Sequence, residues 1–347
     1  MSLNIKAFQV LNGDCFLISF FSLHRNEESY ILIDSGFAST YHRTLKLSMQ
    51  QIADEGKRMD LVVITHFDND HISGFIPFFK DFGVRNVQKI WFNHAGAEFS
   101  FPNNDGNIGA REGIQIRDFL LKTEKLSKNL IYFPQTHLID NVTIRVLSPN
   151  LEDLQSYINK WQDTESDYKS DIQSIGSVKS DKHKTVSELL SDLQTTDRSI
   201  SNRSSIAFLL DHDKRTILFT ADSNPDVLAK SLISIGFSCE FPIKVDLMQV
   251  SHHGSKSNTS LDLLHLIDCN NYLVSTNASN SHQFPHKRAL ALIANTVNER
   301  RPNETINFYF TYDDPIFRDL FTSDEVSKYN IVCKFPPNCD NGINITI

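Results

Sequence analysis

An apolar run ends abruptly in a cluster of ionisable residues at positions 61–74 of this chain. Leu61–Ile64 is rich in β-branched residues and is predicted to form a buried strand. Directly after it come four residues that can bind a metal ion: His66, Asp68, Asp70 and His71. Side chains that leave the end of a rigid strand are held in place by the sheet, as a metal centre requires. The sequence therefore predicts a metal site at this point.

The ligand types narrow the kind of site. Imidazole and carboxylate groups suit divalent zinc, manganese or iron, and the lack of a thiol favours an open, water-binding site over a structural zinc clip. The alternative is a helix N-terminus capped by Asp and Asn, with incidental histidines. The density of histidine and aspartate after a hydrophobic strand favours the metal site.

Two later segments repeat the pattern of an apolar strand followed by candidate ligands. Asp222 follows the strand-like Ile217–Phe219, although the polar residues and proline after it are also typical of a helix start. His252 and His253 follow Val245–Val250. Successive residues of a regular strand face opposite sides, so we expect one of the two to bind metal, and we favour His252. The other histidine is left to bind metal, to orient a ligand or to contact a phosphate.

The motif at 66–71, His-x-Asp-x-Asp-His, resembles the signature of the metallo-β-lactamase superfamily, in the variant where aspartate replaces the second histidine. Other matching pieces stand in the order typical of that superfamily: Asn12–Ile18, Tyr30–Gly36, Thr216–Asp222 and Asp246–Lys256. The His-His-Gly-Ser run in the last piece is most similar to the hydrolase domain attached to bacterial DNA-uptake channels, the ComEC type, and to its free-standing relatives. The resemblance covers about residues 5–295.

This resemblance implies an α/β fold, the αββα sandwich of two mixed sheets flanked by helices. The 347 residues exceed the usual size of one domain, but such a sandwich can occupy residues 1–347 as a single unit. We expect a polar insertion at about 150–200 and a C-terminal extension from about 300. Strands are expected within Leu138–Leu147, Ser205–Leu210, Arg215–Thr220, Ile306–Thr311 and Ile343–Ile347.

The resemblance also implies a centre of two divalent ions, Zn²⁺ or Mn²⁺. The implied metal ligands are His66, Asp68, Asp70, His71, Asp222 and His252. Of these, His66 and Asp68 are assigned to a first ion and the others to a second, with Asp222 as the bridging carboxylate. Substrate binding is assigned to Asn202, Arg203, His253 and Lys256, and catalytic roles to Asp70 and His286.

Two assignments stay open. Asn202 stands where many members of the superfamily place a third histidine for the first ion, and it offers only a neutral oxygen; His94 and His212 are alternatives. One ion is therefore expected to be held weakly, which fits manganese as well as zinc. The late histidine is uncertain because proline precedes His286 instead of following it, and His282 competes for its role toward an oxyanion or a leaving group.

The expected reaction is hydrolysis by a metal-activated water. The resemblance favours cleavage of phosphodiesters in DNA or another nucleic acid, but the superfamily also contains hydrolases of small esters, lactones and phosphodiesters. Two other classes remain as alternatives. One is a di-iron oxidoreductase, which usually carries a flavin-binding partner domain that this sequence does not show. The other is a catalytically weak scaffold or sensor, against which the retention of most ligands argues.

Composition limits the partners. The net charge of −8 argues against an extended grip on duplex nucleic acid, so contact with it would need a local cluster such as Arg203, Lys256, Lys287 and Arg288. No apolar run approaches the roughly 20 residues that cross a membrane, and no leader precedes the strand-like Ile5–Val10. Five scattered cysteines fit a cytoplasmic protein without a disulfide framework. The expected partners are nucleic acid or a small phosphodiester, with room for a protein partner, but no membrane.

Overall fold

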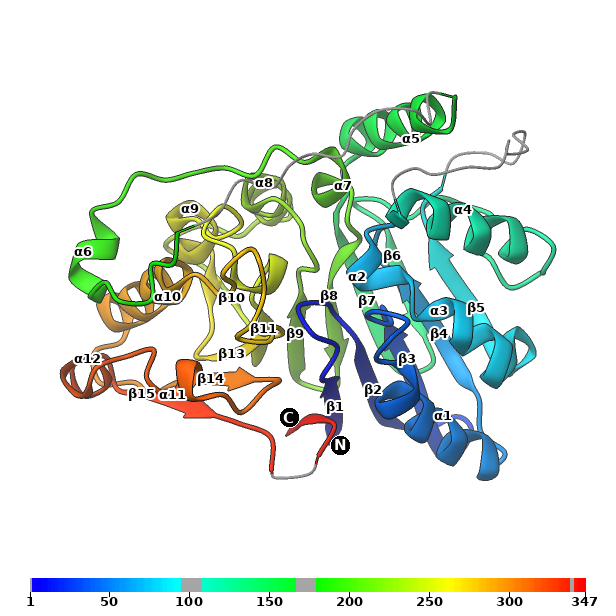
Figure 1. Ribbon diagram of the computed structural model, residues 1–347, viewed down its shortest axis with the longest axis horizontal. Helices are drawn as coiled ribbons and strands as arrows, with labels where there is room; N and C mark the ends of the chain where they lie inside the picture. The colour runs from blue at the N-terminus through cyan, green and yellow to red at the C-terminus, as the bar shows by residue number, and fades with distance from the viewer. Residues whose placement is uncertain (1, 95–107, 167–178, 338–339) are drawn as a thin grey trace.

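The computed structural model describes residues 2–94, 108–166, 179–337 and 340–347. Two β-sheets pack face to face, and helices cover both outer faces (Figure 1). The first sheet has the order β16-β1-β2-β3-β4-β5, and the second has the order β15-β14-β13-β11-β9-β8-β7-β6. This arrangement confirms the αββα sandwich expected from the sequence.

The first sheet is antiparallel at one side and parallel at the other. Strands β1, β2 and β3 form antiparallel neighbours, while β3, β4 and β5 run parallel. The bounds are β1 (Leu3–Phe8), β2 (Phe16–Ser22), β3 (Glu27–Ile33), β4 (Met59–Ile64), β5 (Val87–Phe92) and β16 (Gly342–Thr346).

The second sheet is mixed in the same way. Strands β6 to β9 are antiparallel, and β9, β11, β13, β14 and β15 are parallel. Its bounds are β6 (Thr136–Ile139), β7 (Val142–Ser148), β8 (Ala207–His212), β9 (Arg215–Phe219), β11 (Leu247–Gln249), β13 (Asn271–Val274), β14 (Ile306–Phe310) and β15 (Ile331–Lys334). A separate parallel pair consists of β10 (Ile243–Lys244) and β12 (Ile267–Asp268).

Helices form the outer layers. The α-helices are α1 (Leu45–Asp54), α2 (Asn69–Ile72), α3 (Phe75–Phe78), α4 (Ile108–Leu120), α5 (Leu151–Ser166), α6 (Val186–Leu190), α7 (Ile200–Arg203), α8 (Pro225–Ser234), α9 (Leu261–His265), α10 (Lys287–Arg300), α11 (Pro315–Arg318) and α12 (Ser323–Tyr329). Short 3₁₀ or π turns are η1 (Tyr41–Arg43), η2 (Phe79–Gly83), η3 (Val84–Asn86) and η4 (His252–Gly254). None of the helices in the described ranges has the length and apolar character needed to traverse a bilayer.

The continuous apolar run of β4 follows from its position between the two layers. Leu61 and Val63 pack in the core between the sheets, whereas Val62 and Ile64 pack against the helices outside the first sheet. A strand buried on both faces has no position for a polar side chain. The polar residues therefore begin only where β4 ends, and parallel neighbours bring the ends of β3, β4 and β5 to the same edge.

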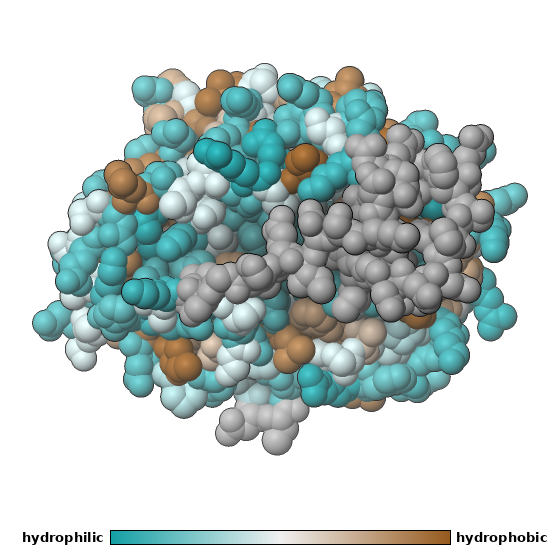
Figure 2. All heavy atoms as spheres, turned by 45° about the horizontal axis from the view of Figure 1, so that its top comes forward, coloured by the Kyte–Doolittle hydropathy of each residue, from teal (hydrophilic) through white to brown (hydrophobic). Residues whose placement is uncertain are grey.

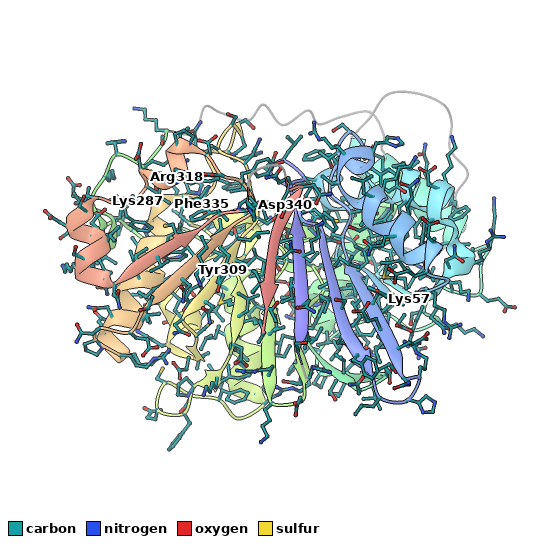
Figure 3. All side chains as sticks on the ribbon, turned by 90° about the horizontal axis from the view of Figure 1, so that it is seen from below. Lys57, Lys287, Tyr309, Arg318, Phe335 and Asp340 are labelled. Carbon is teal, nitrogen blue, oxygen red and sulfur yellow. The ribbon has the colours of Figure 1, made fainter. Side chains whose placement is uncertain are left out.

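The C-terminal residues complete both sheets. Strands β14 and β15 extend the second sheet, and β16 pairs antiparallel with β1 from Asn4–Thr346 to Phe8–Gly342. Figure 3 shows β16 beside β1, with Asp340 near its start. Strands predicted at Ile306–Thr311 and Ile343–Ile347 are thus present, and they belong to the sandwich itself.

The expected polar insertion crosses the edge where the parallel strands end. Its described parts contain α5, which lies above the first sheet, and α6, which lies beside α10 of the second sheet's outer layer (Figure 1). The chain then returns to α7, which lies between α5 and α8 (Figure 1). Trp161 and Tyr157 of α5 are buried against Phe67, in the loop that follows β4. The insertion is therefore packed onto the loop that carries the predicted metal ligands.

Candidate metal centre

The predicted ligands converge at the carboxyl ends of the parallel strands. The loop and helix after β4 provide His66–His71, the turn after β9 provides Asp222, and η4 after β11 provides His252 and His253. Around this edge the visible surface is mainly hydrophilic, with scattered hydrophobic side chains (Figure 2). Because these loops follow strands of the two sheets, the sandwich brings together candidate ligands that lie far apart in the sequence.

Asp222 stands at the middle of the cluster, and its two carboxylate oxygens face different histidines. Oδ2 lies 3.8 Å from His66 Nε2 and 3.5 Å from His252 Nε2. Oδ1 lies 3.5 Å from His71 Nε2 and 3.8 Å from His253 Nε2. One carboxylate thus divides four imidazoles into two pairs, as a bridging ligand would.

Each pair is joined by one carboxylate from the loop after β4. Asp68 Oδ2 lies 3.6 Å from His66 Nε2, which gives a first group of His66, Asp68 and His252. Asp70 Oδ2 lies 3.4 Å from His253 Nε2, which gives a second group of Asp70, His71 and His253. We call these the first and second groups; both share Asp222.

The atoms that face one another here lack other partners. His66 Nε2, His71 Nε2, His253 Nε2 and Asp222 Oδ1 are buried and form no hydrogen bond with any described residue. Buried polar atoms are normally hydrogen-bonded, so several unpaired atoms at one place call for a missing partner. Ligand atoms within 4.8 Å of one another, which suits one divalent ion, occur in the sets His66–His71–Asp222, Asp70–His71–His253, Asp14–Asp222–His253 and Asp14–Asp34–His71. Asp68 and His252 lie at the margin of these sets in the described structure, each within 3.6 Å of one member.

Hydrogen bonds behind the imidazoles fix which ring nitrogen is available. His71 Nδ1 donates to Asp34 Oδ2 (2.8 Å), and His253 Nδ1 donates to the carbonyl oxygen of Ser275 (3.0 Å). His252 Nδ1 lies 3.0 Å from Asn258 Oδ1. A proton held on Nδ1 leaves Nε2 as the metal-binding atom, and Nε2 is the atom that faces Asp222 in each case.

Asp34 also reaches the first group through Thr65. The Thr65 hydroxyl donates to Asp34 Oδ2 (2.7 Å) and lies 3.0 Å from His66 Nδ1, from which it accepts. The Thr65 main-chain N–H donates to Asp34 Oδ1 (2.8 Å). A single buried carboxylate therefore orients one histidine of each group.

The charges in the cluster stabilise one another. Burial opposes the charged form of His71 and of His253, yet Asp222 raises the pKa of both well above the usual value. Burial likewise opposes ionisation of Asp70, but His71 and His253 lower its pKa to about 2. A cluster that holds protons between ionised carboxylates exchanges those protons for cations when a metal binds.

The two adjacent histidines are both brought to the centre by an unusual backbone. His252 and His253 have φ of 49° and 56°, in the left-handed region, instead of the extended values that would alternate their side chains. We expected one of them to reach the metals, with His252 on the second ion. The structure places His252 in the first group and His253 in the second. His252 thus occupies the position left open for a third ligand of the first ion.

Two small residues permit close packing at the centre. A Cβ added to Gly13 would lie 2.1 Å from the carbonyl oxygen of Asp70, so glycine is required there. Ala221, where the superfamily more often has glycine, has φ of 45°. Its carbonyl oxygen accepts from His252 N (3.0 Å), so this turn ties the loop of Asp222 to the histidine pair.

Several other predicted residues have different surroundings from those expected. Arg203 forms an ion pair with Asp153 at 2.8 Å, and Asn202 Nδ2 donates to Asp197 Oδ2 at 2.6 Å. Lys287 is buried against Glu325 at 2.9 Å. Arg288 is also buried, and its guanidinium binds Gln194 and the carbonyl oxygen of Asp192. Of the four basic candidates, only Lys256 has no side-chain ion pair or hydrogen bond to another described residue.

The late histidines have separate positions. His286 is buried at the start of α10, and its Nδ1 accepts from the main-chain N–H of Lys256 at 3.3 Å. Burial lowers the pKa of His286 to about 4, so the ring is neutral near pH 7. His282 is partly exposed and stacks on Phe284, which also contacts the rings of His252 and His253. His282 is therefore better placed than His286 to meet a substrate.

Neither alternative ligand joins the centre. His212 ends β8 and contacts Asn141 and Phe20, and His94 packs beside Phe92. Neither belongs to a potential metal cluster within the described parts of the chain. Sequence reasoning gave no role to Asp14, Asp34 or Asp197. The first two lie in segments that resemble the superfamily, but nothing in the sequence around Asp197 indicates its role.

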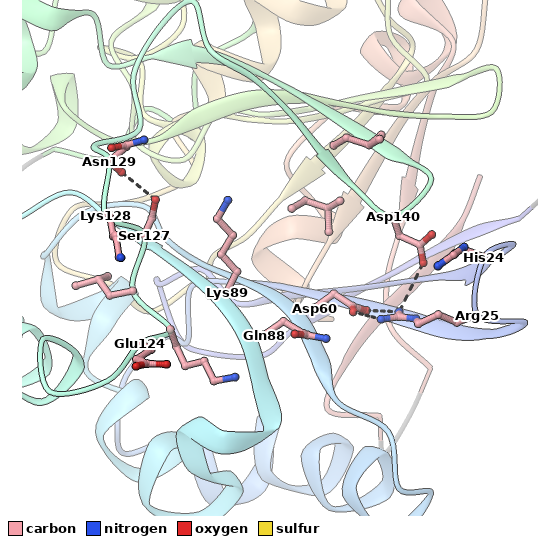
Figure 4. A pocket seen from close by; sticks show the side chains of 14 residues that line it. His24, Arg25, Asp60, Gln88, Lys89, Glu124, Ser127, Lys128, Asn129 and Asp140 are labelled. Atoms are coloured by element: carbon pink, nitrogen blue, oxygen red, sulfur yellow. Dashed lines mark hydrogen bonds and ion pairs between the residues drawn. The ribbon is translucent and has the colours of Figure 1, made fainter.

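A cavity outside the ligand cluster lies at the other end of β4. Its volume is about 630 Å³, and Lys89, Lys128, Asp60 and Asp140 are among the residues that line it (Figure 4). Asp60 belongs to the start of β4, whereas the metal ligands follow the end of that strand. This cavity is therefore not part of the candidate metal centre.

This chain is similar to several known proteins. Over 88 residues the chain is 33% identical to Recombination protein 2 of Haemophilus influenzae, a match that covers 24% of this chain and 10% of that protein. The chain thus spans about a tenth of the length of this relative. The protein YhfI from Bacillus subtilis, a metallo-β-lactamase fold protein, has 11% identity and a TM-score of 0.45 over 99% of both chains.

A long form RNase Z from yeast has 7% identity and a TM-score of 0.37, over 89% of this chain and 36% of that one. These structural likenesses are too weak to indicate a substrate. The family model of the metallo-β-lactamase superfamily matches residues 9–276, which include every member of both ligand groups. This chain therefore belongs to the metallo-β-lactamase superfamily.

Proposed function

We propose that this protein is a metal-dependent phosphodiesterase that cleaves nucleic acid with a metal-activated water. The observation that carries the proposal is the meeting of four imidazoles on the two oxygens of Asp222, with buried ring nitrogens that have no other partner in the described structure. The superfamily typically binds two metal ions, and the residues present fit that number.

Zn²⁺ or Mn²⁺ is the proposed metal. Imidazole suits zinc, while the carboxylates of Asp68, Asp70 and Asp222 also suit manganese. Two such ions, when bound, would lower the pKa of a water molecule and offset the charge that develops on a phosphoryl group. The first group would hold one ion, the second group the other, and Asp222 would contact both.

The chain supplies the orientation that this chemistry requires. Asp34 and Thr65 hold His71 and His66, so that both Nε2 atoms point to Asp222. Asn12 Nδ2 donates to Asp70 Oδ2 at 3.4 Å and restricts the carboxylate beside His253. Preorganised ligands of this kind stabilise a transition state without further rearrangement.

The surroundings of the site bear on the substrate. Lys256 and His282 are the partly exposed polar groups beside the histidine pair that can meet an anionic substrate and its leaving group. The name of the H. influenzae relative refers to recombination, which supports a nucleic-acid substrate. A second candidate substrate is a small phosphodiester. It is favoured by the ion pair of Arg203 and the burial of Lys287 and Arg288, which leave little positive surface for a long polyanion.

The test is turnover with and without the metal ligands. Metal-stripped protein reloaded with Zn²⁺ or Mn²⁺ is assayed on DNA, RNA and a bis-aryl phosphodiester. Asp68→Ala, Asp70→Ala and Asp222→Ala should each lose roughly a thousandfold in rate, because each removes a ligand needed in the transition state.

Asp226→Ala is the matched control, since this exposed aspartate lies in α8, close in sequence to Asp222. It should keep the wild-type rate. Wild-type rates in the three ligand variants would assign the activity to another site or to a contaminant. Turnover of the small diester without turnover of DNA or RNA would favour the second candidate substrate.

A further inference from the structure

The two ligand groups share Asp34, which contacts His71 directly and His66 through Thr65, but their other supports come from different parts of the chain. The residues behind the second group are Asp34, which follows β3, and Ser275, which follows β13. The residues behind the first group include Asp197 and Ser201, from the end of the polar insertion. We call residues 197–202 the docking segment.

The docking segment contacts both outer ligands of the first group. Asp197 Oδ2 lies 3.4 Å from His252 Nδ1. The Ser201 hydroxyl donates to Asp68 Oδ1 at 2.7 Å, which leaves Asp68 Oδ2 facing His66. No hydrogen bond or ion pair joins this segment to Asp70, His71 or His253 in the described structure.

Asp197 is held firmly in its place. Its Oδ1 accepts from Ser199 N (2.8 Å), and its Oδ2 accepts from Asn202 Nδ2 (2.6 Å) and Asn258 Nδ2 (3.0 Å). Its main-chain carbonyl accepts from Asn224 Nδ2 (2.7 Å), and its N–H donates to Ser257 O (3.2 Å). These bonds tie the segment to the loops after β9 and β11, so the carboxylate is positioned before any metal arrives.

The groups also differ in how many of their members are exposed. In the first group the side chains of Asp68 and His252 are 36% and 23% exposed, and that of His66 is fully buried. In the second group His71 and His253 are 0% and 1% exposed, and only Asp70, at 21%, is partly exposed. The first group therefore has two members toward the insertion and the solvent, and both histidines of the second group are enclosed.

We infer that the docking segment builds the first metal position, with Asp197 as the residue that positions His252. This inference rests on the proposed two-metal centre. Asn258 Oδ1 accepts from His252 Nδ1 at 3.0 Å, and Asp197 Oδ2 accepts from Asn258 Nδ2 at 3.0 Å and lies 3.4 Å from the same Nδ1. Asp197 thus keeps the proton on Nδ1 partly by holding Asn258, which leaves Nε2 free for the metal, while Ser201 fixes the rotamer of Asp68. The second position binds metal without the segment. The two positions therefore fill in order, the second before the first, and the insertion controls how firmly the first ion is held.

The experiment measures the two metal affinities separately. Full-length protein is stripped of metal and titrated with Zn²⁺ or Mn²⁺ against a chromophoric chelator, and metal content is measured after dialysis. The wild type should show a tight and a weaker site. Asp197→Asn should weaken the weaker site by roughly 10–100-fold and leave the tight site unchanged, so that dialysed protein keeps about one ion.

Two further variants make the result specific. Ser201→Ala removes only the bond to Asp68 and should weaken the same site, which provides a second test should Asp197→Asn fold poorly. Asp192→Asn is the matched control, because this exposed aspartate of the insertion pairs with Lys184 and contacts neither group. It should match the wild type at both sites.

The outcomes separate this inference from the proposed function. The role of the docking segment would be overturned if the two variants, Asp197→Asn and Ser201→Ala, kept wild-type affinity at the two metal positions. Equal losses of affinity at the two positions would overturn it as well. A wild type that binds no metal would overturn the proposed centre as a whole. Two ions in the wild type, with selective loss of one in the variants, would support both.

Discussion

Replacing Asp34 by asparagine tests how the centre prepares its histidines. Asp34 is fully buried, and its Oδ2 accepts from His71 Nδ1 at 2.8 Å and from the Thr65 hydroxyl at 2.7 Å. In Asp34→Asn, one oxygen can still accept from the Thr65 main-chain N–H. The new amide group then faces His71, and it can only donate. His71 must therefore accept at Nδ1 and carry its proton on Nε2, the atom needed for the metal.

The size of the effect follows from the bond that is lost. A hydrogen bond to a charged group contributes about 1.5–3 kcal/mol. Because about 1.4 kcal/mol is a factor of ten in affinity, the second metal position should weaken by roughly 10–150-fold. The metal affinity of the first position should change less, because Asp34 contacts His66 only through the Thr65 hydroxyl.

The assay is the competitive metal titration described above, with thermal unfolding of the metal-free protein recorded in parallel. Asp60→Asn is the control, because Asp60 is also a buried aspartate of the first sheet but binds Arg25 and the main-chain N–H of Tyr30 at the other end of β4. It should lower stability without changing either metal affinity. An Asp34→Asn protein that binds both ions as tightly as the wild type would refute the argument from the tautomer.

Three further outcomes are expected. Gly13→Ala should weaken metal binding in the same titration, because its Cβ would lie 2.1 Å from the carbonyl oxygen of Asp70 and must displace that residue. The pKa of His286 is about 4 in the folded protein, against an ordinary value of 6.5, so the unfolded chain takes up a proton first as the pH falls. The free energy of unfolding should therefore fall by up to about 3 kcal/mol between pH 6.5 and pH 4. Denaturant unfolding of His286→Asn should lack this part of the pH dependence. Lys256→Glu should raise KM for DNA and reduce its dependence on salt, with little change for a small diester; equal changes for both substrates would contradict a contact with the nucleic-acid backbone.

The fold was expected from the resemblance to the superfamily, and most of the candidate centre could be predicted because its signals are local. Leu61–Ile64 had to be a doubly buried strand, and polar residues can begin only where such a strand ends. The same reasoning placed Asp222 after β9. These residues could be identified without any knowledge of what lies opposite them.

What could not be predicted depends on backbone geometry and on distant contacts. Strand alternation favours one of His252 and His253, and a turn at Gly254 was expected to relax that limit without showing which way each ring would point. The left-handed backbone of both residues brings both rings to the centre. The bond from Ser201 to Asp68 joins residues 133 positions apart. Nothing in a polar, weakly periodic segment indicates which of its residues will reach a loop so distant in the chain.

The contacts of the basic residues limit how many positive side chains near the centre are free to attract an anionic substrate. Lys287 and Arg288 look suited to a polyanion in the sequence, yet Glu325 neutralises the first, and the second binds the main chain of the insertion. Arg203 is paired with Asp153, which belongs to the same insertion. Three of these four candidate groups therefore hold the protein together, and among the four only Lys256 forms no side-chain ion pair or hydrogen bond with a described residue. Under the proposed function, attraction for a phosphodiester would come chiefly from cations held at the centre, which would concentrate recognition on the bond that is cleaved.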